Sequence, residues 1–337
     1  MAAKKVLIVS YYWPPAGGIS VLRSLKIAKY LLQFGWEPVI YTVEDAQYPI
    51  VDEDNFDHVP EGITILKKKA LEPFKFYKKL TKRKNKDTLA NVLNANDRNG
   101  GILHRLSVWT RANFFIPDAR ALWVKPSVAY LTNYLKNNPV DAIFSDGPPH
   151  TNTLIACRVS KATNTPWLMD WQDPWTQVDY YKLFPISKWA DEIHKRQEQE
   201  CIKQASVITT VSPSWKQDLE EIGGENVHFI PWGYDEEDYT EFSHDLALDN
   251  YFSITHIGLL GEDRIPYNLL DVLSDICSEN IHFKKDFKLE LFGTVDFTLI
   301  SYAKEKGLEE NLINKNQIPR KGALEKISTS QLLLLLL

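Results

Sequence analysis

The first 235 residues repeat one pattern: a short run of β-branched or other apolar residues, then a loop, then a stretch with helical periodicity. Parallel strands need a crossover connection, which is usually a helix, so the pattern predicts βαβ units around a parallel sheet. The fold class is therefore α/β, with a doubly wound sheet. We expect strands at 6–11, 38–43, 63–67, 142–145, 167–171, 207–211 and 228–231.

The stretch 20–34 predicts the first helix of this domain. Leu22, Leu25, Ala28 and Leu32 fall on one face of it, as an amphipathic helix requires. The basic residues of the stretch, Arg23 among them, are expected to point away from that face.

A second αβ segment follows the acidic, aromatic stretch 234–242, with strands expected at 253–259 and 289–292. The leucine run 332–337 is too short to cross a bilayer, and we predict a buried parallel strand there. We therefore assign one Rossmann-like domain to 1–235 and a second, partial one to 236–337. A Rossmann-like domain normally continues past such a strand with further helices and strands. We therefore expect the chain to be shorter than a protein with two complete domains of this kind.

Composition narrows the class of protein. The 337 residues are 44% hydrophobic, which is enough apolar material for two cores. A formal net charge of -5 argues against general nucleic-acid binding. The three cysteines lack metal-ligand or disulfide spacing, so we expect buried free thiols, no metal and a cytoplasmic protein.

The first candidate site is the turn that carries Trp13, Gly17 and Gly18, placed after the first expected strand. Ligands of doubly wound sheets bind at the carboxyl ends of strands. Two glycines let the backbone approach a ligand, and their amides at a helix start can hold a phosphate. A turn that merely needs a positive φ remains the alternative. The sequence is not G-x-G-x-x-G, which disfavours a nicotinamide dehydrogenase.

Two further candidate sites also follow expected strands. Asp146 and His150 lie in a Gly-Pro-Pro loop. In one reading Asp146 caps the turn and His150 opens the next helix, and in the other His150 donates to a substrate hydroxyl or phosphate. Carboxylates and indoles alternate from 170 to 175. Aromatic faces and carboxylates suit carbohydrate or nucleobase recognition, whereas capping and packing are the structural alternative.

These motifs together resemble a known family. The order Tyr-Tyr-Trp-Pro-Pro-Ala-Gly-Gly at 11–18, Ser-Asp-Gly-Pro-Pro-His at 145–150, Asp-Trp-Gln-Asp-Pro-Trp at 170–175 and Val-Ser-Pro-Ser at 211–214 is similar to retaining glycosyltransferases of the GT-B type, especially family 4. His-Ile-Gly-Leu-Leu at 256–260 is similar to the start of the donor domain of that family. The resemblance implies two Rossmann-like domains that face each other across a cleft, with the acceptor on the first and a nucleotide-sugar on the second.

The resemblance also implies roles for single residues. Catalysis would involve His150, Asp173 and Arg264, with Arg264 stabilising the departing diphosphate. The donor would contact Gly17, Gly18, Gly258 and Arg264, and the substrate would contact Trp13, Asp146, Asp170, Trp171 and Trp175. The nucleotide-sugar is a co-substrate, so no cofactor or metal is expected.

Two departures from the family pattern stand out. Glu262 and Asp263 precede Arg264 without a following lysine, and the glutamate motif of the family would fall beyond Leu337. One alternative function is therefore a truncated, catalytically inactive transferase-like binding protein. Another is a nucleotide-sugar epimerase on the same fold.

A basic run with interleaved aromatic residues extends from Lys67 to Lys86. It suits an anionic membrane surface or a polyprenyl-phosphate acceptor, while a solvated loop is the alternative. We expect a glycosyltransferase of polysaccharide or glycoconjugate biosynthesis that moves a hexosyl unit to a glycan or lipid-linked acceptor. It would be cytoplasmic, with peripheral contact to the inner face of the plasma membrane.

Overall fold

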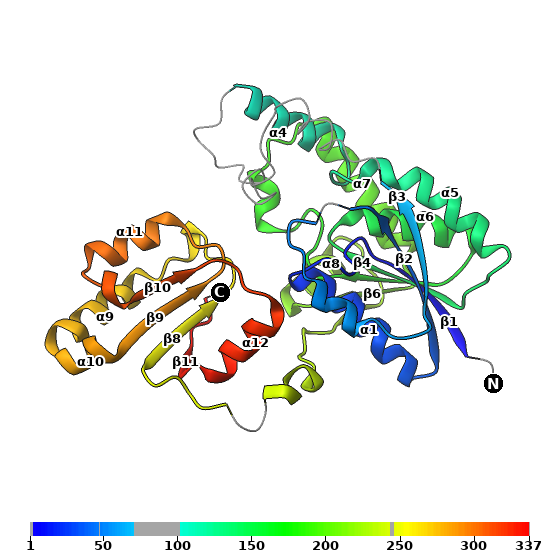
Figure 1. Cartoon of the computed structure of the whole chain (residues 1–337). Helices are drawn as coiled ribbons and strands as arrows, with labels where there is room; N and C mark the ends of the chain where they lie inside the picture. Colours follow the sequence, from blue (N-terminus) through cyan, green and yellow to red (C-terminus); the bar gives the residue numbers. More distant parts are fainter. Residues whose placement is uncertain (1–2, 47, 71–101, 243–245, 337) are drawn as a thin grey trace. The chain divides into compact units, whose positions relative to one another are not determined.

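The computed structural model of the chain describes residues 3–46, 48–70, 102–242 and 246–336 (Figure 1). It divides into two compact units, Met1–Trp232 and Gly233–Leu337. We call them unit 1 and unit 2 and describe each by itself.

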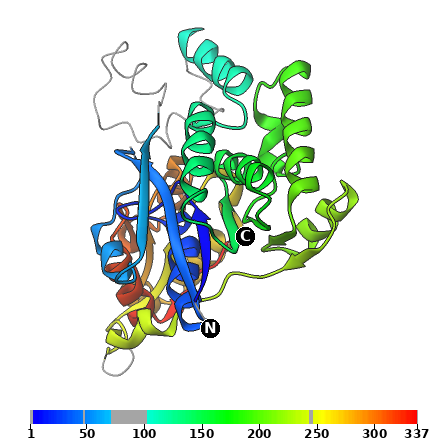
Figure 2. The ribbon, with the colours of Figure 1, turned by 90° about the vertical axis from the view of Figure 1, so that its right-hand side faces the viewer.

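Unit 1 is built on a seven-stranded sheet in the order β3-β2-β1-β4-β5-β6-β7, and every pairing in it is parallel. The predicted doubly wound parallel sheet is therefore confirmed, and each expected strand has a counterpart within a few residues. Figure 2 shows the strands β1 to β3 running side by side in blue. The strands are β1 (Lys4–Val9), β2 (Trp36–Glu44), β3 (Thr64–Lys69), β4 (Ala142–Gly147), β5 (Trp167–Trp171), β6 (Val207–Thr210) and β7 (Val227–Phe229).

Helices cover both faces of this sheet because successive strand side chains point to opposite faces. Val6 and Ile8 of β1 pack in one cluster with Leu25 of the first helix. Leu7 and Val9 pack in another, against residues of α5 and α6. The helices are α1 (Ile19–Gln33), α4 (Ile102–Phe114), α5 (Val124–Leu135), α6 (His150–Thr163), α7 (Lys188–Gln204) and α8 (Pro213–Glu221).

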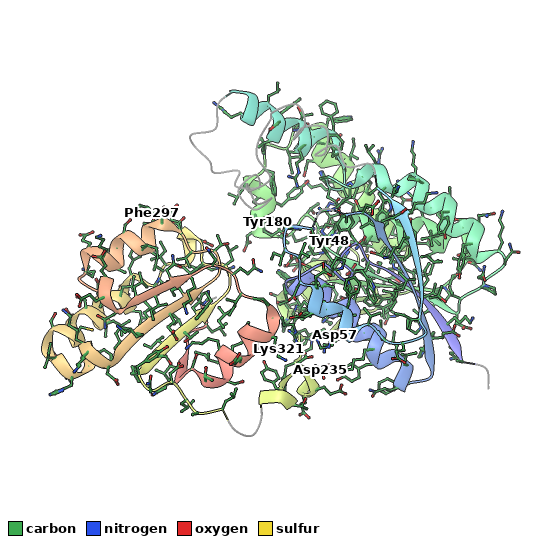
Figure 3. All side chains as sticks on the ribbon, in the orientation of Figure 1. Tyr48, Asp57, Tyr180, Asp235, Phe297 and Lys321 are labelled. Carbon is green, nitrogen blue, oxygen red and sulfur yellow. The ribbon has the colours of Figure 1, made fainter. Side chains whose placement is uncertain are left out.

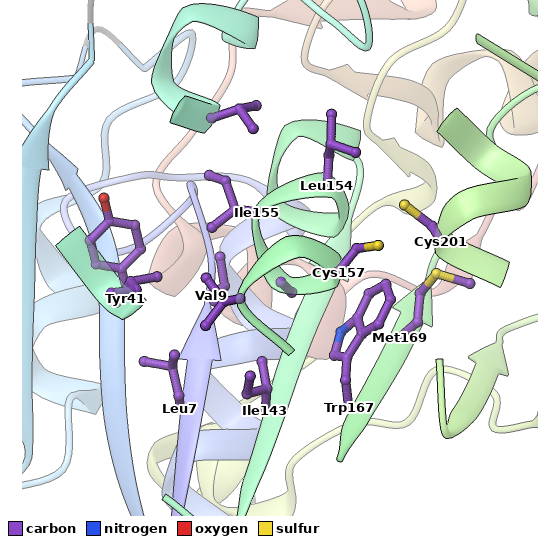
Figure 4. Packing of buried hydrophobic residues seen from close by; sticks show 14 of the residues in the cluster. Leu7, Val9, Tyr41, Ile143, Leu154, Ile155, Cys157, Trp167, Met169 and Cys201 are labelled. Carbon is purple, nitrogen blue, oxygen red and sulfur yellow. The ribbon is translucent and has the colours of Figure 1, made fainter. Parts of the chain in front are cut away.

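The second cluster is the main core of unit 1. Figure 4 shows Leu154, Ile155 and Cys157 of α6 above the strand residues Ile143 and Trp167. All five side chains are buried, and Cys157 is a free thiol like the other two cysteines. A dry, closely packed layer of this kind fixes where α6 begins, and therefore where the loop before it lies.

The predicted burial of α1 needs a correction. Arg23 was expected to face solvent, but it is buried, whereas Leu32 is 41% exposed. The buried positions are Val21, Arg23, Ser24, Leu25 and Ala28. The buried stripe is therefore rotated from the predicted one, because Arg23 finds a buried carboxylate that the local pattern could not reveal.

Unit 2 has a four-stranded sheet in the order β10-β9-β8-β11, again parallel throughout. Its core joins strand residues such as Leu289 to Leu273 of α9 and Leu299 of α11. The elements are β8 (Phe252–Ile257), α9 (Tyr267–Glu279), α10 (Ile281–Asp286), β9 (Phe287–Phe292), α11 (Phe297–Glu305), β10 (Leu312–Lys315), α12 (Arg320–Thr329) and β11 (Leu332–Leu333).

The leucine run forms a parallel strand, but not a buried one. Only Leu332 and Leu333 pair with β8, at the edge of the sheet. Leu332, Leu333 and Leu335 are exposed, the last by 79%. The prediction of a buried strand was therefore wrong for these described leucines, since no neighbouring strand or helix covers them.

Candidate functional site

In each unit the strand order reverses at one strand, the topological switch point, and predicted site residues lie in the segment after that strand. In unit 1, β1 pairs with β2 on one side and with β4 on the other, so the chain winds away from this point both ways. Ligands of doubly wound sheets bind beyond the carboxyl ends of such strands. The turn with Gly17 and Gly18 follows β1, and the loop before His150 follows β4.

The two glycines of the first turn differ in their roles. The Gly17 amide donates to the Ile50 carbonyl at 2.9 Å, and a Cβ there would lie 2.6 Å from Ile50 Cγ2. Gly17 is thus required by packing. Gly18 is exposed, with φ 78° and ψ −173°, in a backbone region that essentially only glycine adopts. It precedes α1, and no side chain among the described residues caps the first amides of this helix.

Asp146 lies beneath this region rather than on its surface. It is fully buried, and its carboxylate accepts hydrogen bonds from Ser10 Oγ at 2.8 Å, Ser24 Oγ at 2.7 Å and Asn152 Nδ2 at 2.6 Å. Burial raises the pKa of Asp146 to about 7, although the three donors oppose this shift. Asp146 thus connects the segment after β1 to α1 and α6. It positions the candidate site from the protein interior.

Asp170 is also occupied by the protein. Its two oxygens accept from Arg23 Nε at 2.6 Å and Arg23 Nη2 at 2.8 Å, and Thr209 Oγ1 donates at 2.6 Å. The pair is buried on both sides. A bidentate arrangement of this kind holds α1 to the end of β5 and leaves no oxygen of Asp170 facing solvent.

Two of the predicted tryptophans belong to the interior. Trp13 packs in the core beside α1. Trp171 is fully buried, and its Nε1 donates to Thr153 Oγ1 at 3.0 Å. The structure therefore places neither indole face where a sugar could stack on it.

Trp175 and His150 do come together, in a stacked pair. Their ring centroids are 4.9 Å apart with an interplanar angle of 2°, and Trp175 Nε1 donates to His194 Nδ1 at 3.0 Å. Burial lowers the pKa of His150 to about 4, so its imidazole is neutral at pH 7. Its Nδ1 has no hydrogen-bond partner among the described atoms.

Gly147 makes room for this pair. A Cβ at Gly147 would lie 2.9 Å from Trp171 Cδ1 and 3.3 Å from His150 Nδ1. A larger residue there would therefore displace the start of α6.

His150 and Trp175 line a cavity of about 620 Å³ within unit 1. Sequence reasoning assigned no role to most residues of its polar wall, because all of them except Tyr12 lie away from the ends of the expected strands. Figure 3 labels one of them, Tyr180, in the segment between β5 and α7. The missed polar residues are Tyr12, Arg111, Asp118, Arg120, Tyr180, Tyr181 and His194.

Asp118 fixes one side of this cavity against α6. Its carboxylate accepts from the Thr151 amide and the Thr151 hydroxyl, both at 2.8 Å, and from the Arg120 amide at 2.9 Å. Arg120 Nη2 donates to the Tyr12 hydroxyl at 3.1 Å. The loop between α4 and α5 and the turn after β1 are therefore tied to the start of α6.

Asp173 stands apart from these groups. It is half-buried, lies outside the lining of the cavity and accepts a hydrogen bond from Tyr180. Burial raises the pKa of Asp173, an effect that this hydrogen bond reduces. The structure thus places Asp173 behind a tyrosine of the cavity wall.

Unit 2 repeats the arrangement on a smaller scale. The strand order of this sheet reverses at β8, which pairs with β9 on one side and with β11 on the other. Gly258 and Arg264 lie in the segment after β8. The Gly258 carbonyl oxygen would lie 2.1 Å from a Cβ on Gly293, so the two loops need glycine to approach. The side chain of Arg264 is half-exposed, so its guanidinium is accessible. Its Nε lies 3.8 Å from Asp263 Oδ2.

Sequence reasoning assigned no role to His256, which also lies at this switch point. It is buried, its Nδ1 is 3.1 Å from the Leu334 carbonyl oxygen, and its Nε2 has no partner among the described atoms. The signal available was its position two residues before Gly258.

The described residues contain no group of three or more acidic, histidine or cysteine residues arranged to hold a metal ion. None of their helices combines the length and the apolar character that crossing a membrane requires.

Comparison with known families gives one match. The model of the glycosyl transferase 4-like domain matches residues 89–233. That range contains every lining residue of the cavity except Tyr12 and Ser20. No curated protein matches the sequence.

Solved structures resemble the chain over almost its whole length. Sucrose-phosphate synthase from Thermosynechococcus elongatus aligns with TM-score 0.55 and 12% identity, over 98% of this chain and 74% of that one. HepE from Anabaena, in complex with UDP, aligns with TM-score 0.53 and 14% identity, over 95% and 71%. A putative UDP-N-acetylglucosamine 2-epimerase from Listeria monocytogenes aligns with TM-score 0.50 and 10% identity, over 98% and 74%.

Identities this low establish the fold and nothing further. The chain has two parallel-sheet α/β domains of the GT-B type, as the sequence predicted. Because the epimerase shares this fold, function must be argued from the site.

Proposed function

We propose that the protein is a glycosyltransferase that moves a hexosyl unit from a nucleotide-sugar to a glycan or lipid-linked acceptor, in polysaccharide or glycoconjugate biosynthesis. One observation carries the proposal: the family model matches the segment that forms nearly all of the cavity wall. The cavity is lined by residues that follow β1 and β4, at the switch point where such a fold binds ligands.

The donor would be held by backbone amides and one guanidinium. Gly18 leaves the first amides of α1 uncapped, and helix starts bind phosphate well. In unit 2, Gly258 and Arg264 occupy the equivalent loop after β8. HepE has been solved with UDP bound, which supports a uridine or other nucleoside diphosphate here.

Transfer would proceed by attack of an acceptor hydroxyl oxygen on the anomeric carbon, with breakage of the bond from that carbon to the diphosphate and passage of the hydroxyl proton to the departing diphosphate. Arg264 would stabilise the charge that develops on the leaving diphosphate. The neutral His150 lines the cavity and would border the acceptor there, with its Nδ1 buried beside Gly147. With a pKa of about 4, His150 is too weak a base to remove the proton completely at pH 7.

Retention of anomeric configuration belongs to this proposal and rests on the resemblance to family 4. The predicted membrane contact through Lys67 to Lys86 also remains a proposal. Within that run the structure describes Lys67, Lys68 and Lys69 on β3, and the other lysines lie outside the described residues.

Calorimetric titration with nucleoside diphosphates and nucleotide-sugars tests the donor site. We expect binding of at least one nucleotide and its loss in Gly18→Val, because a side chain would both strain this backbone and crowd the phosphate position. Gly62→Val is the matched control, since Gly62 also has a positive φ, of 76°. Gly62 precedes β3 and so lies at the amino ends of the strands, whereas Gly18 follows β1 at their carboxyl ends. Equal affinity in the Gly18 and Gly62 variants would contradict the proposed donor site.

A further inference from the structure

The wall of the unit 1 cavity is made largely of apolar side chains. Leu106, Val108, Phe115, Phe184 and Ile186 are among its lining residues. Leu106 is also 55% exposed, so it lies at the rim, where the cavity meets the surface. The volume of about 620 Å³ is typical of sites that hold small organic molecules. The cavity therefore offers apolar surface both inside and at its opening.

The two lining tyrosines that precede α7 have hydroxyls that are already bonded within the protein. Tyr181 Oη donates to Asp191 Oδ1 at 3.0 Å, and the hydroxyl of Tyr180 donates to Asp173. A hydroxyl that donates to a carboxylate has no second proton to give to a ligand. Tyr180 and Tyr181 therefore offer the cavity their rings, with at most an acceptor lone pair.

The ring nitrogens of the wall bring no charge to it. Trp175 Nε1 donates to His194 Nδ1 at 3.0 Å. Burial lowers the pKa of His150 and of His194, so both imidazoles are neutral at pH 7. His150 Nδ1 is buried beside Gly147. Trp175 and the two histidines therefore act mainly as flat, uncharged surfaces.

Each charged group of the described wall has a partner within the protein. Asp118 accepts hydrogen bonds from Thr151 and from the Arg120 amide. The Arg120 guanidinium donates to the Tyr12 hydroxyl at 3.1 Å. Arg111 likewise interacts with another group of the protein. An ionic ligand would have to compete with these partners, so the wall does not favour one.

A glycan and a hydrocarbon chain make opposite demands on such a wall. A sugar carries a hydroxyl on nearly every carbon, and a hydroxyl buried without a hydrogen bond costs free energy. Among the described lining residues, Ser20 and Thr110 are the hydroxyls that make no hydrogen bond within the protein. Two hydroxyls cannot satisfy a buried sugar. A hydrocarbon chain needs no hydrogen bond and gains free energy by burial of its apolar surface.

We propose that this cavity binds an uncharged hydrocarbon chain, and that the acceptor of the transferase is therefore lipid-linked rather than a free glycan. The chain would lie along Phe115, Phe184 and Ile186 and leave the cavity past Leu106. The inference rests on the proposed function in one respect, the naming of the acceptor. Binding of the chain can be tested without any nucleotide-sugar.

The test is calorimetric titration of the full chain with geraniol, with the disaccharides maltose and lactose, and with geranyl phosphate. We expect geraniol to bind at least about tenfold more tightly than either disaccharide, because only geraniol matches an apolar wall. Geranyl phosphate should bind within about threefold of geraniol, since the cations of the wall already have partners.

Three results would overturn the proposal. Disaccharide binding as tight as that of geraniol would indicate a glycan site. An advantage of about tenfold or more for geranyl phosphate over geraniol would show that the wall recognises an anion. Absence of geraniol binding would show that the apolar wall holds no chain.

Matched variants test the apolar wall itself. Phe184→Ser should weaken geraniol binding by about tenfold, because it removes an aromatic ring from the lining. Phe184→Leu keeps an apolar side chain and should retain the affinity within about threefold. Leu183→Ser is the control, since Leu183 is an exposed neighbour that does not line the cavity, and it should change the affinity by less than about twofold.

Circular dichroism checks that each variant folds. Equal affinity for geraniol in Phe184→Ser and Leu183→Ser would refute the placement of the chain along Phe184.

The unsubstituted protein distinguishes this inference from the proposed function, because it is also titrated with the nucleotide-sugars. Nucleotide-sugar binding without geraniol binding would refute the chain site and leave the transferase intact. Geraniol binding without nucleotide-sugar binding would support the chain site and count against the transferase.

Discussion

Single residues were the hardest level to predict. The sequence indicated that the tryptophans and aspartates of 170–175 carry chemistry, but the structure uses Asp170 and Trp171 in the interior. The partner of Asp170 is Arg23, which is 147 positions away, and a local pattern cannot reveal a pairing of that kind. Only His150 and Trp175 of the predicted first-domain residues line the cavity.

The buried ion pair gives a prediction for stability. Asp170→Asn should lower the free energy of unfolding of unit 1 by about 3–5 kcal/mol, because it leaves the buried Arg23 charge without a partner. Hydrogen exchange of α1 and β5 during urea titration measures this change. The control Glu220→Gln breaks the exposed Lys216 pair and should cost less than about 1 kcal/mol. A similarly small loss in both variants would show that the buried pair contributes little.

His150 predicts a pH dependence. Its folded pKa of about 4 lies below the ordinary value of 6.5, so the unfolded state binds the proton more readily. Stability from this group is present above pH 6.5 and is lost as the pH falls toward 4, with a loss of about 2 kcal/mol at pH 5. Unfolding of unit 1 at pH 7, 6 and 5 measures it.

The His150→Gln variant should lack this part of the acid sensitivity. His282→Gln, which replaces an exposed histidine of unit 2, is the control and should behave like the unsubstituted protein. Identical pH profiles for His150→Gln and the control would contradict the assignment.

At the scale of elements, the sequence predicted more. Short apolar runs between stretches of helical periodicity located the strands of unit 1, because parallel strands buried on both faces are continuous apolar runs. β10 was missed, since Leu312–Lys315 is short and half polar. The loop between α4 and α5 was also missed, although Asp118 and Arg120 in it help to form the cavity. The sequence of such a loop has no hydrophobic periodicity that would indicate its contribution to the cavity, because that contribution depends on tertiary contacts.

The anchoring of that loop to α6 can be tested. Asp118→Ala should cost about 1 kcal/mol, the usual loss of a helix-capping interaction, and should speed hydrogen exchange in the first turn of α6. The matched control is Asp296→Ala, which removes the cap of α11 at Thr298 in unit 2. Unchanged exchange at α6 in Asp118→Ala would show that the loop is held by other contacts.

At the scale of the molecule, the class of fold followed from alternation of strand and helix patterns alone. The composition supported two cores, and the chain divides at Trp232 and Gly233. What the sequence could not provide was the cavity, because its wall is assembled from the segment after β1, from α1, α4, α6 and α7, and from loops of unit 1. Function therefore rests on the coincidence of the cavity with the matched family segment.

The most direct measurement is product analysis after incubating the protein with UDP-, GDP- and ADP-sugars, with a short-chain prenyl phosphate as acceptor. We predict release of the nucleoside diphosphate from at least one donor, together with a glycosylated lipid, and loss of both products in Gly18→Val but not in Gly62→Val. Conversion of a nucleotide-sugar into its epimer without diphosphate release would instead indicate an epimerase. Absence of any turnover with every donor would contradict the assignment as a transferase.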